Sequence, residues 1–136
     1  MAATTSCTSG TTGALRKTID AYIDTYPGLG ALVDWEGIDC TVPMIERVDP
    51  GQGFDWHYDQ TAATKDQRIL AGLLYLSTIA DAGYTEFLHQ RASVQPERGK
   101  IVLFPPYWTH IHRGATPGTG VKYVLSYFWI YPNKAE

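Results

Sequence analysis

Residues 121–130 read Val-Lys-Tyr-Val-Leu-Ser-Tyr-Phe-Trp-Ile, and this run is the strongest indication of the fold in the sequence. Successive side chains of a β-strand point to opposite faces. One face would then carry Lys122, Val124, Ser126 and Phe128, and the other Tyr123, Leu125, Tyr127 and Trp129. Because both sets are mostly apolar, the run predicts a central strand, Val121–Tyr131, that is covered on both sides.

The chain upstream of this run reads as further short strands from Val42 onward, separated by Gly, Pro, Asp and Asn. We expect them at Met44–Val48, Ile69–Ser77, Thr85–Leu88, Lys100–Phe104 and Thr109–His112. One helix is expected over Ala14–Tyr26, because apolar residues recur there at helical spacing and Pro27 follows. The pattern predicts a mainly β fold, a sandwich or jelly roll, with a helix packed outside it.

Composition limits the organisation and the class of protein. The chain has 136 residues, which suits one domain over residues 14–136, and residues 1–13 are rich in Ser, Thr, Ala and Gly, as in a flexible tail. A net charge of −3 without a run of basic residues argues against nucleic-acid binding. The apolar stretch Ile69–Ala80 is too short to span a bilayer, and the amino terminus lacks the pattern of a signal peptide. We therefore expect a soluble, cytoplasmic protein.

The first two candidate metal ligands are His57 and Asp59, an H-x-D pair that follows the Gly-rich turn 50–53. With 4 histidines and 14 acidic residues in the chain, such a pair arises easily by chance, so the context has to decide. His112, followed by Arg and Gly, supplies a second imidazole. Two histidines and one carboxylate on one face of a metal leave the opposite face open, which is the arrangement of non-haem Fe(II) oxygenases.

Lys122 and His110 each allow two interpretations. On the strand alone, Lys122 would more often extend to solvent than point inward, since a buried lysine without a partner is rare. Its position ten residues after His112 (122 − 112 = 10) favours the inward direction, where it would meet an anion. His110 is an alternative ligand to His112, but the same offset and the His-Arg-Gly sequence favour His112. His89 has no acidic partner at ligand spacing and is expected to be an ordinary surface histidine.

Several short motifs within Val48–Tyr131 follow one another in the order typical of one protein family. They are the stretch 51–59 with its H-x-D pair, Arg68 with Tyr75-Leu76, Gly83-Tyr84-Thr85-Glu86-Phe87, Pro96-x-x-Gly99, Phe104-Pro105, the stretch 108–114 and Gly120-x-Lys122-Tyr123 with Trp129. Together they resemble the prolyl 4-hydroxylase-like branch of the Fe(II)/2-oxoglutarate-dependent oxygenases, and most of all its small bacterial and phage-type members. The resemblance implies a double-stranded β-helix with one or two supporting amino-terminal helices.

The resemblance also implies the cofactors and the residues that bind them. Fe(II), 2-oxoglutarate and O2 would be used, with ascorbate as a further possible requirement. His57, Asp59 and His112 resemble the metal ligands. Lys122 resembles the base that binds the distal carboxylate of 2-oxoglutarate, with hydroxyl groups from Tyr75 and Ser126. The implied reaction is the hydroxylation of a prolyl or other side chain in a peptide or protein, or of a small molecule, with succinate and CO2 as co-products.

Two other classes remain open on the sequence. A cupin-like β-helix protein that binds Zn or Mn would need the metal ligands but neither Lys122 nor 2-oxoglutarate. A non-catalytic binding module could also keep the fold. The aromatic residues near the motifs, Trp56, Tyr58, Tyr107 and Trp108, either line the mouth of a cleft or belong to the core. The sequence determines neither the substrate nor the oligomeric state.

Overall fold

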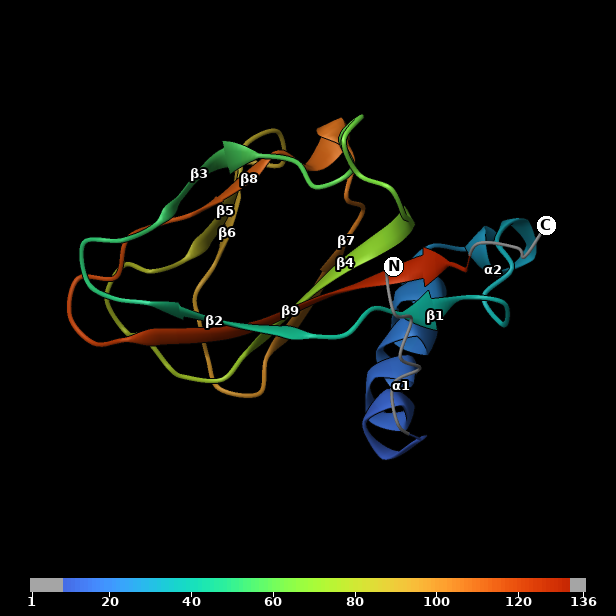
Figure 1. Ribbon diagram of the computed structural model, residues 1–136, viewed down its shortest axis with the longest axis horizontal. Helices are drawn as coiled ribbons and strands as arrows, with labels where there is room; N and C mark the ends of the chain where they lie inside the picture. Colours follow the sequence, from blue (N-terminus) through green and yellow to red (C-terminus); the bar gives the residue numbers. More distant parts are fainter. Residues whose placement is uncertain (1–8, 133–136) are drawn as a thin grey trace.

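Two antiparallel β-sheets face each other in the computed structural model, which describes residues 9–132, and two helices lie outside them (Figure 1). The helices are α1 (Ser9–Thr25) and α2 (Leu29–Leu32). The major sheet contains β1 (Asp39–Cys40), β2 (Met44–Val48), β4 (Gln67–Tyr75), β7 (Ile101–Phe104) and β9 (Lys122–Tyr131). The minor sheet contains β3 (Phe54–His57), β5 (Thr85–Phe87), β6 (Ala92–Val94) and β8 (His112–Gly114), and a 3-10 turn, η1 (Trp108–His110), precedes β8. This is the jelly-roll architecture of a double-stranded β-helix.

Strand β9 is the central element of the major sheet, as its apolar pattern predicts. It pairs with β4 on one side and with β1 and β2 on the other. On its outer face, Tyr127 and Trp129 pack against Leu15 and Ile19 of α1 in one buried cluster. Gly72 of β4 lies opposite Tyr127, and a Cβ atom at this glycine would overlap the tyrosine ring. Helix α1 therefore covers the outer face of the sheet around Tyr127 and Trp129, whereas Tyr123 on the same face is exposed.

The inner face of the major sheet looks toward the minor sheet. Its lining includes alternate residues of β9, namely Lys122, Val124, Ser126 and Phe128, as period two predicts. Strand β2 is antiparallel to β9, with Val48 opposite Lys122 and Met44 opposite Ser126. The same alternation brings Met44, Glu46 and Val48 to the inner face.

The structure differs from the predicted elements in several places, including β1, which lies before the first predicted strand, and β4, which is Gln67–Tyr75 and not Ile69–Ser77. Strands β3 and β6 were not expected, because runs of three or four residues carry too little periodicity. The predicted strand Thr109–His112 is wrong over most of its length: the His110 N–H donates to the Tyr107 carbonyl in a 3-10 turn, and β8 starts only at His112.

Helix α1 starts at Ser9, before the predicted start at Ala14, and ends at Thr25 just ahead of Pro27. The predicted flexible tail thus overlaps the first turn of the helix, and its residues 1–8 lie outside the described residues. No helix within residues 9–132 has the length and apolar character needed to cross a membrane.

Candidate functional site

His57, Asp59 and His112 meet at one end of the minor sheet. His57 ends β3, His112 starts β8, and the two residues are directly paired across these antiparallel strands. Their ring centroids lie 4.3 Å apart. The carboxylate oxygens of Asp59 lie 3.6 Å from His57 Nε2 and 3.7 Å from His112 Nε2. One ligand atom from each of the three residues lies within 4.8 Å of the other two, a spacing that suits a single metal ion.

Backbone carbonyls fix both imidazole rings in the orientation that metal binding requires. His57 Nδ1 lies 2.7 Å from the carbonyl oxygen of Asp55, and His112 Nδ1 lies 2.9 Å from that of His110. A carbonyl oxygen only accepts, so each Nδ1 carries the proton and each Nε2 is left with its lone pair. This is the support that metal-bound histidines usually have.

The surroundings of His112 favour its neutral form. The side chain is buried, and the rings of Phe104 and Phe87 lie 4.7 Å and 5.8 Å from its ring, measured between centroids. Burial lowers the pKa of His112, and the hydrogen bond to the His110 carbonyl and the charge of Asp59 oppose this shift only in part. A neutral imidazole is the form that binds a metal.

The other two histidines are outside this group. His110 lies in η1, its Nδ1 is 3.0 Å from the Thr109 hydroxyl, and it contributes to the site through its carbonyl. His89 is exposed. Among the residues that the structure describes, His57, Asp59 and His112 form the one group of three or more candidate metal ligands.

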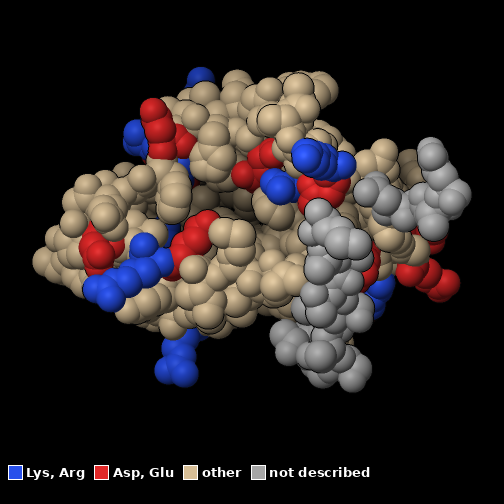
Figure 2. Space-filling view, viewed as in Figure 1, with Lys and Arg blue, Asp and Glu red and all other residues tan. Residues whose placement is uncertain are grey.

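A cavity of about 340 Å³ extends from the three candidate ligands into the space between the two sheets. The molecular surface is hollowed here, with acidic and basic side chains around the opening (Figure 2). The charged and polar residues of the lining include Glu46, His57, Asp59, Arg68, Thr85, His112, Lys122 and Ser126. The volume is in the range of pockets that enclose small molecules.

Lys122 points into this cavity and is 4% exposed. Within residues 9–132 its ammonium group has neither a hydrogen bond nor an ion pair, and its Nζ lies 5.7 Å from the centroid of the Tyr75 ring. Burial lowers the pKa of Lys122 to about 8, partly opposed by the charge of Glu46. A buried cation without an anion is costly, so this position is suited to an anionic ligand.

Tyr75 is fully buried, and its hydroxyl lies 2.6 Å from the Thr85 hydroxyl. This hydrogen bond joins β4 of the major sheet to β5 of the minor sheet. Burial raises the pKa of Tyr75, so the phenol keeps its proton and stays a donor. Thr85, and not Tyr75, belongs to the cavity lining. Thr85 was noted in the sequence only as part of a motif.

Glu46 is a cavity residue that the sequence interpretation missed. Its carboxylate accepts a long hydrogen bond of 3.4 Å from the Ser126 hydroxyl, and the residue is half-buried. Burial raises the pKa of Glu46, while the Ser126 hydrogen bond and the charge of Lys122 lower it. The alternation in β2 could have revealed it, because Glu46 stands between Met44 and Val48 on one face.

Arg68 is the other charged residue of the cavity lining, and its contacts keep it against the cavity wall. Arg68 pairs with Asp66 at 3.0 Å and stacks its guanidinium over Phe128, 3.9 Å from the ring centroid. Four aromatic residues were considered for the mouth of a cleft: Trp56, Tyr58, Tyr107 and Trp108. None of them is among the described residues that line this cavity.

Comparisons with known proteins agree with this geometry. Residues 43–131 match the model of the 2OG-Fe(II) oxygenase superfamily, which is well over half of the chain. No curated protein matches the sequence. Among solved structures, the viral collagen prolyl hydroxylase of Paramecium Bursaria Chlorella virus-1, in its 2OG complex, is similar with a TM-score of 0.69 and 21% identity, over 88% of this chain and 72% of that chain.

Two further prolyl hydroxylase structures have the same fold. A prolyl hydroxylase from Trichoplax adhaerens, in complex with a hypoxia inducible factor peptide fragment, has a TM-score of 0.64 and 19% identity, over 86% of this chain and 55% of that one. The Pseudomonas putida prolyl-4-hydroxylase has a TM-score of 0.57 and 19% identity, over 85% and 66%. The match to the family model carries the assignment: this chain belongs to the 2OG-Fe(II) oxygenase superfamily, whose cofactors are Fe(II) and 2-oxoglutarate.

Proposed function

We propose that this protein is a 2-oxoglutarate-dependent hydroxylase in which His57, Asp59 and His112 hold Fe(II). Lys122 would bind the distal carboxylate of 2-oxoglutarate. Its substrate would be a prolyl or other side chain in a peptide or protein, or a small molecule. One observation carries the proposal: the three candidate metal ligands line the same cavity as the buried ammonium of Lys122, which has no hydrogen bond or ion pair within residues 9–132.

The donor set fits Fe(II). Two neutral imidazole nitrogens and one carboxylate oxygen are the ligands of the 2-His-1-carboxylate site, which leaves the other metal positions open. Asp59 is fixed by its backbone, since its N–H donates to the Pro106 carbonyl at 3.1 Å and its carbonyl accepts from Thr64 Oγ1 at 3.1 Å. A carboxylate in this position also leaves no metal site for a halide, which favours hydroxylation over halogenation.

The inner face of the major sheet fits a dicarboxylate. Lys122 would supply the charge, and Ser126, four residues later on the same face, would supply a hydroxyl. Tyr75 would donate to the same carboxylate, or would orient Thr85 to do so through their shared hydrogen bond. The apolar walls of Val48, Phe104 and Phe128 would exclude water and so strengthen these contacts.

When bound, Fe(II) and 2-oxoglutarate would supply the activation of O2, with succinate and CO2 as co-products. The chain would hold the metal ligands in place, neutralise the distal carboxylate and keep the reacting atoms away from bulk water. The solved relatives support a peptide as one class of substrate, because one is named as a collagen prolyl hydroxylase and another contains a peptide fragment.

The turnover of 2-oxoglutarate without substrate tests this proposal. Asp59→Ala should abolish succinate formation and sharply reduce the affinity for Fe(II), because a charged ligand of the metal is lost. His89→Ala, a matched change of an exposed histidine, should leave both quantities unchanged. Full turnover in Asp59→Ala would show that the proposed metal site is wrong.

A further inference from the structure

Among the described residues that line the cavity, Glu46 is the one charged residue left without a partner once the proposed ligands are bound. Four residues with a formal charge line the cavity: Glu46, Asp59, Arg68 and Lys122. Arg68 is already matched by Asp66, at 3.0 Å. With Fe(II) and 2-oxoglutarate bound, the charges of the metal and the co-substrate cancel, and those of Asp59 and Lys122 cancel. The carboxylate of Glu46 is left over.

The contacts of Glu46 do not explain its position. Among the described residues, the carboxylate of Glu46 has one hydrogen bond, the 3.4 Å contact with the Ser126 hydroxyl, at the upper limit for such a bond. The charge of Lys122 acts on this carboxylate, but the two side chains do not form an ion pair within 4 Å. Carboxylates are rarely placed in a half-buried cavity unless a cation or a strong donor meets them there.

The walls beside Glu46 suit an alkyl chain. Met44 and Phe54 line the cavity but are also exposed, so the opening to solvent lies next to them. Val48, on the same face of β2 as Glu46, is buried, so Glu46 lies between the mouth and the interior. A flexible apolar chain that passes Met44 could place a cationic end group at Glu46.

We propose that Glu46 selects the substrate of this enzyme by its charge, and that the substrate carries an ammonium or guanidinium group on an alkyl chain, as in lysine and arginine side chains. This inference rests on the proposed function and names its substrate class. A planar guanidinium would pair with both carboxylate oxygens, whereas an ammonium group would pair as a point charge.

Binding to the anaerobic Fe(II)–2-oxoglutarate form, measured by calorimetry, tests this inference. The probes are capped amino acids in matched pairs: N-acetyl-arginine amide with N-acetyl-citrulline amide, and N-acetyl-lysine amide with N-acetyl-norleucine amide. The wild type should bind at least one cationic probe roughly 10–100-fold more tightly than its neutral partner. Glu46→Gln should reduce this preference to less than about threefold.

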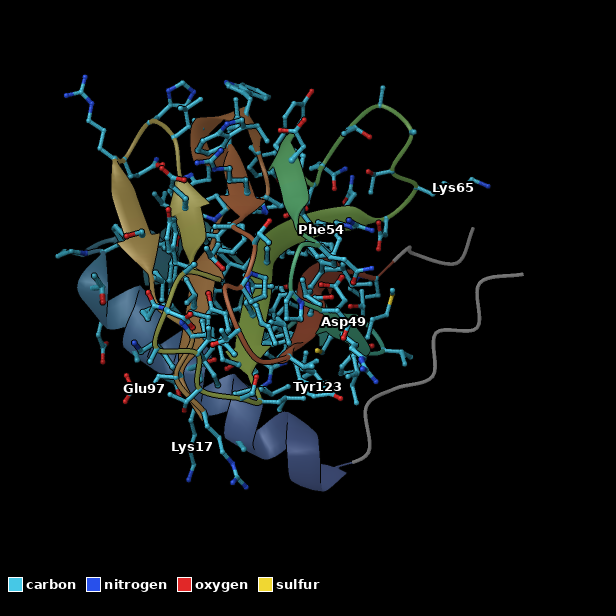
Figure 3. All side chains as sticks on the ribbon, turned by 90° about the vertical axis from the view of Figure 1, so that its left-hand side faces the viewer. Lys17, Asp49, Phe54, Lys65, Glu97 and Tyr123 are labelled. Atoms are coloured by element: carbon cyan, nitrogen blue, oxygen red, sulfur yellow. The ribbon has the colours of Figure 1, made fainter. Side chains whose placement is uncertain are left out.

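Two controls separate the possible outcomes. Glu97→Gln changes an exposed glutamate whose side chain extends outward, away from the labelled Phe54 in Figure 3, and should keep the wild-type preference. Glu46→Gln should bind 2-oxoglutarate as tightly as the wild type or more tightly, since a like charge is removed.

The inference is overturned if no cationic probe is preferred by the wild type, or if Glu46→Gln keeps the preference. It is also overturned if Glu46→Gln binds 2-oxoglutarate more weakly, because the Glu46 carboxylate would then support the co-substrate site and not select the substrate. Failure of the wild type to bind 2-oxoglutarate would instead contradict the proposed function itself.

Discussion

The two sheets supply different parts of the candidate site and do so by different means. The minor sheet carries His57 and His112 on short strands, and each ring is fixed by a carbonyl two residues away in the chain. The major sheet carries Lys122 on its longest strand, β9. The pKa of this lysine depends on its burial between the two sheets. The candidate metal ligands are thus oriented by contacts within their own strands, whereas the proposed anion site depends on burial between the two sheets.

If this contrast holds, a change on the major sheet should affect 2-oxoglutarate and leave the metal nearly untouched. Lys122→Ala should lower the affinity for 2-oxoglutarate by about two to three orders of magnitude, since losing one partner of a buried ion pair costs about 3–5 kcal/mol. Fe(II) affinity, measured by titration of the same variant, should stay close to that of the wild type.

Lys122→Arg is the matched control for this prediction. It should keep part of the affinity because the charge remains, although the longer, forked guanidinium fits a pocket built for ammonium less well. An unchanged affinity for 2-oxoglutarate in Lys122→Ala would contradict the role of Lys122 and would favour the cupin-like class.

The hydrogen bond between Tyr75 and Thr85 joins the two sheets, so changes at either residue test how both sheets contribute to the anion site. Tyr75→Phe should weaken 2-oxoglutarate binding by about 1–3 kcal/mol if the phenol donates to the carboxylate. Thr85→Val breaks the same 2.6 Å contact from the other side. Calorimetric titration of both variants separates the two roles: a larger loss in Thr85→Val would assign the donor to Thr85, which lines the cavity.

The pH dependence of co-substrate binding tests whether the anion site depends on burial. Because burial disfavours the charged form, the pKa of Lys122 is lowered to about 8. The ammonium group is thus present below this pH and is lost as the pH rises through it. The affinity for 2-oxoglutarate should fall roughly tenfold between pH 7 and pH 9 in the wild type. In Lys122→Arg, whose side chain does not titrate, this fall should disappear.

The smallest effect is expected at Ser126. Its hydroxyl makes one long contact with Glu46, and Ser126→Ala should weaken 2-oxoglutarate binding by about 0.5–1.5 kcal/mol. Ser93→Ala, on β6 and outside the cavity lining, provides the control and should have no effect. A loss at Ser126 as large as that of Lys122→Ala would mean that the charge is not the main determinant.

The same contrast explains how much the sequence could predict. Periodicity identified β2 with its observed bounds and β9 to within one residue, because long or clearly alternating strands carry a strong pattern. It missed β3, which holds His57, since four residues are too few for a pattern. There the prediction of the ligands came from residue types and spacing instead.

The rest depended on tertiary structure. Whether Lys122 points inward could not be decided from β9 alone, since burial depends on the opposite sheet. Glu46 was overlooked because a single charge in a short strand usually faces solvent. The 3-10 turn at His110 was missed because it depends on a backbone hydrogen bond to Tyr107.

Anaerobic titration of the Fe(II)-loaded protein with 2-oxoglutarate, followed by the metal-to-ligand charge-transfer absorption, tests whether one site binds both the metal and the co-substrate. The band reports a 2-oxoglutarate molecule that binds to iron at the site built by both sheets. We predict that it appears in the wild type and saturates at one equivalent of 2-oxoglutarate. Iron-loaded protein that shows no such band at saturating 2-oxoglutarate would contradict the account.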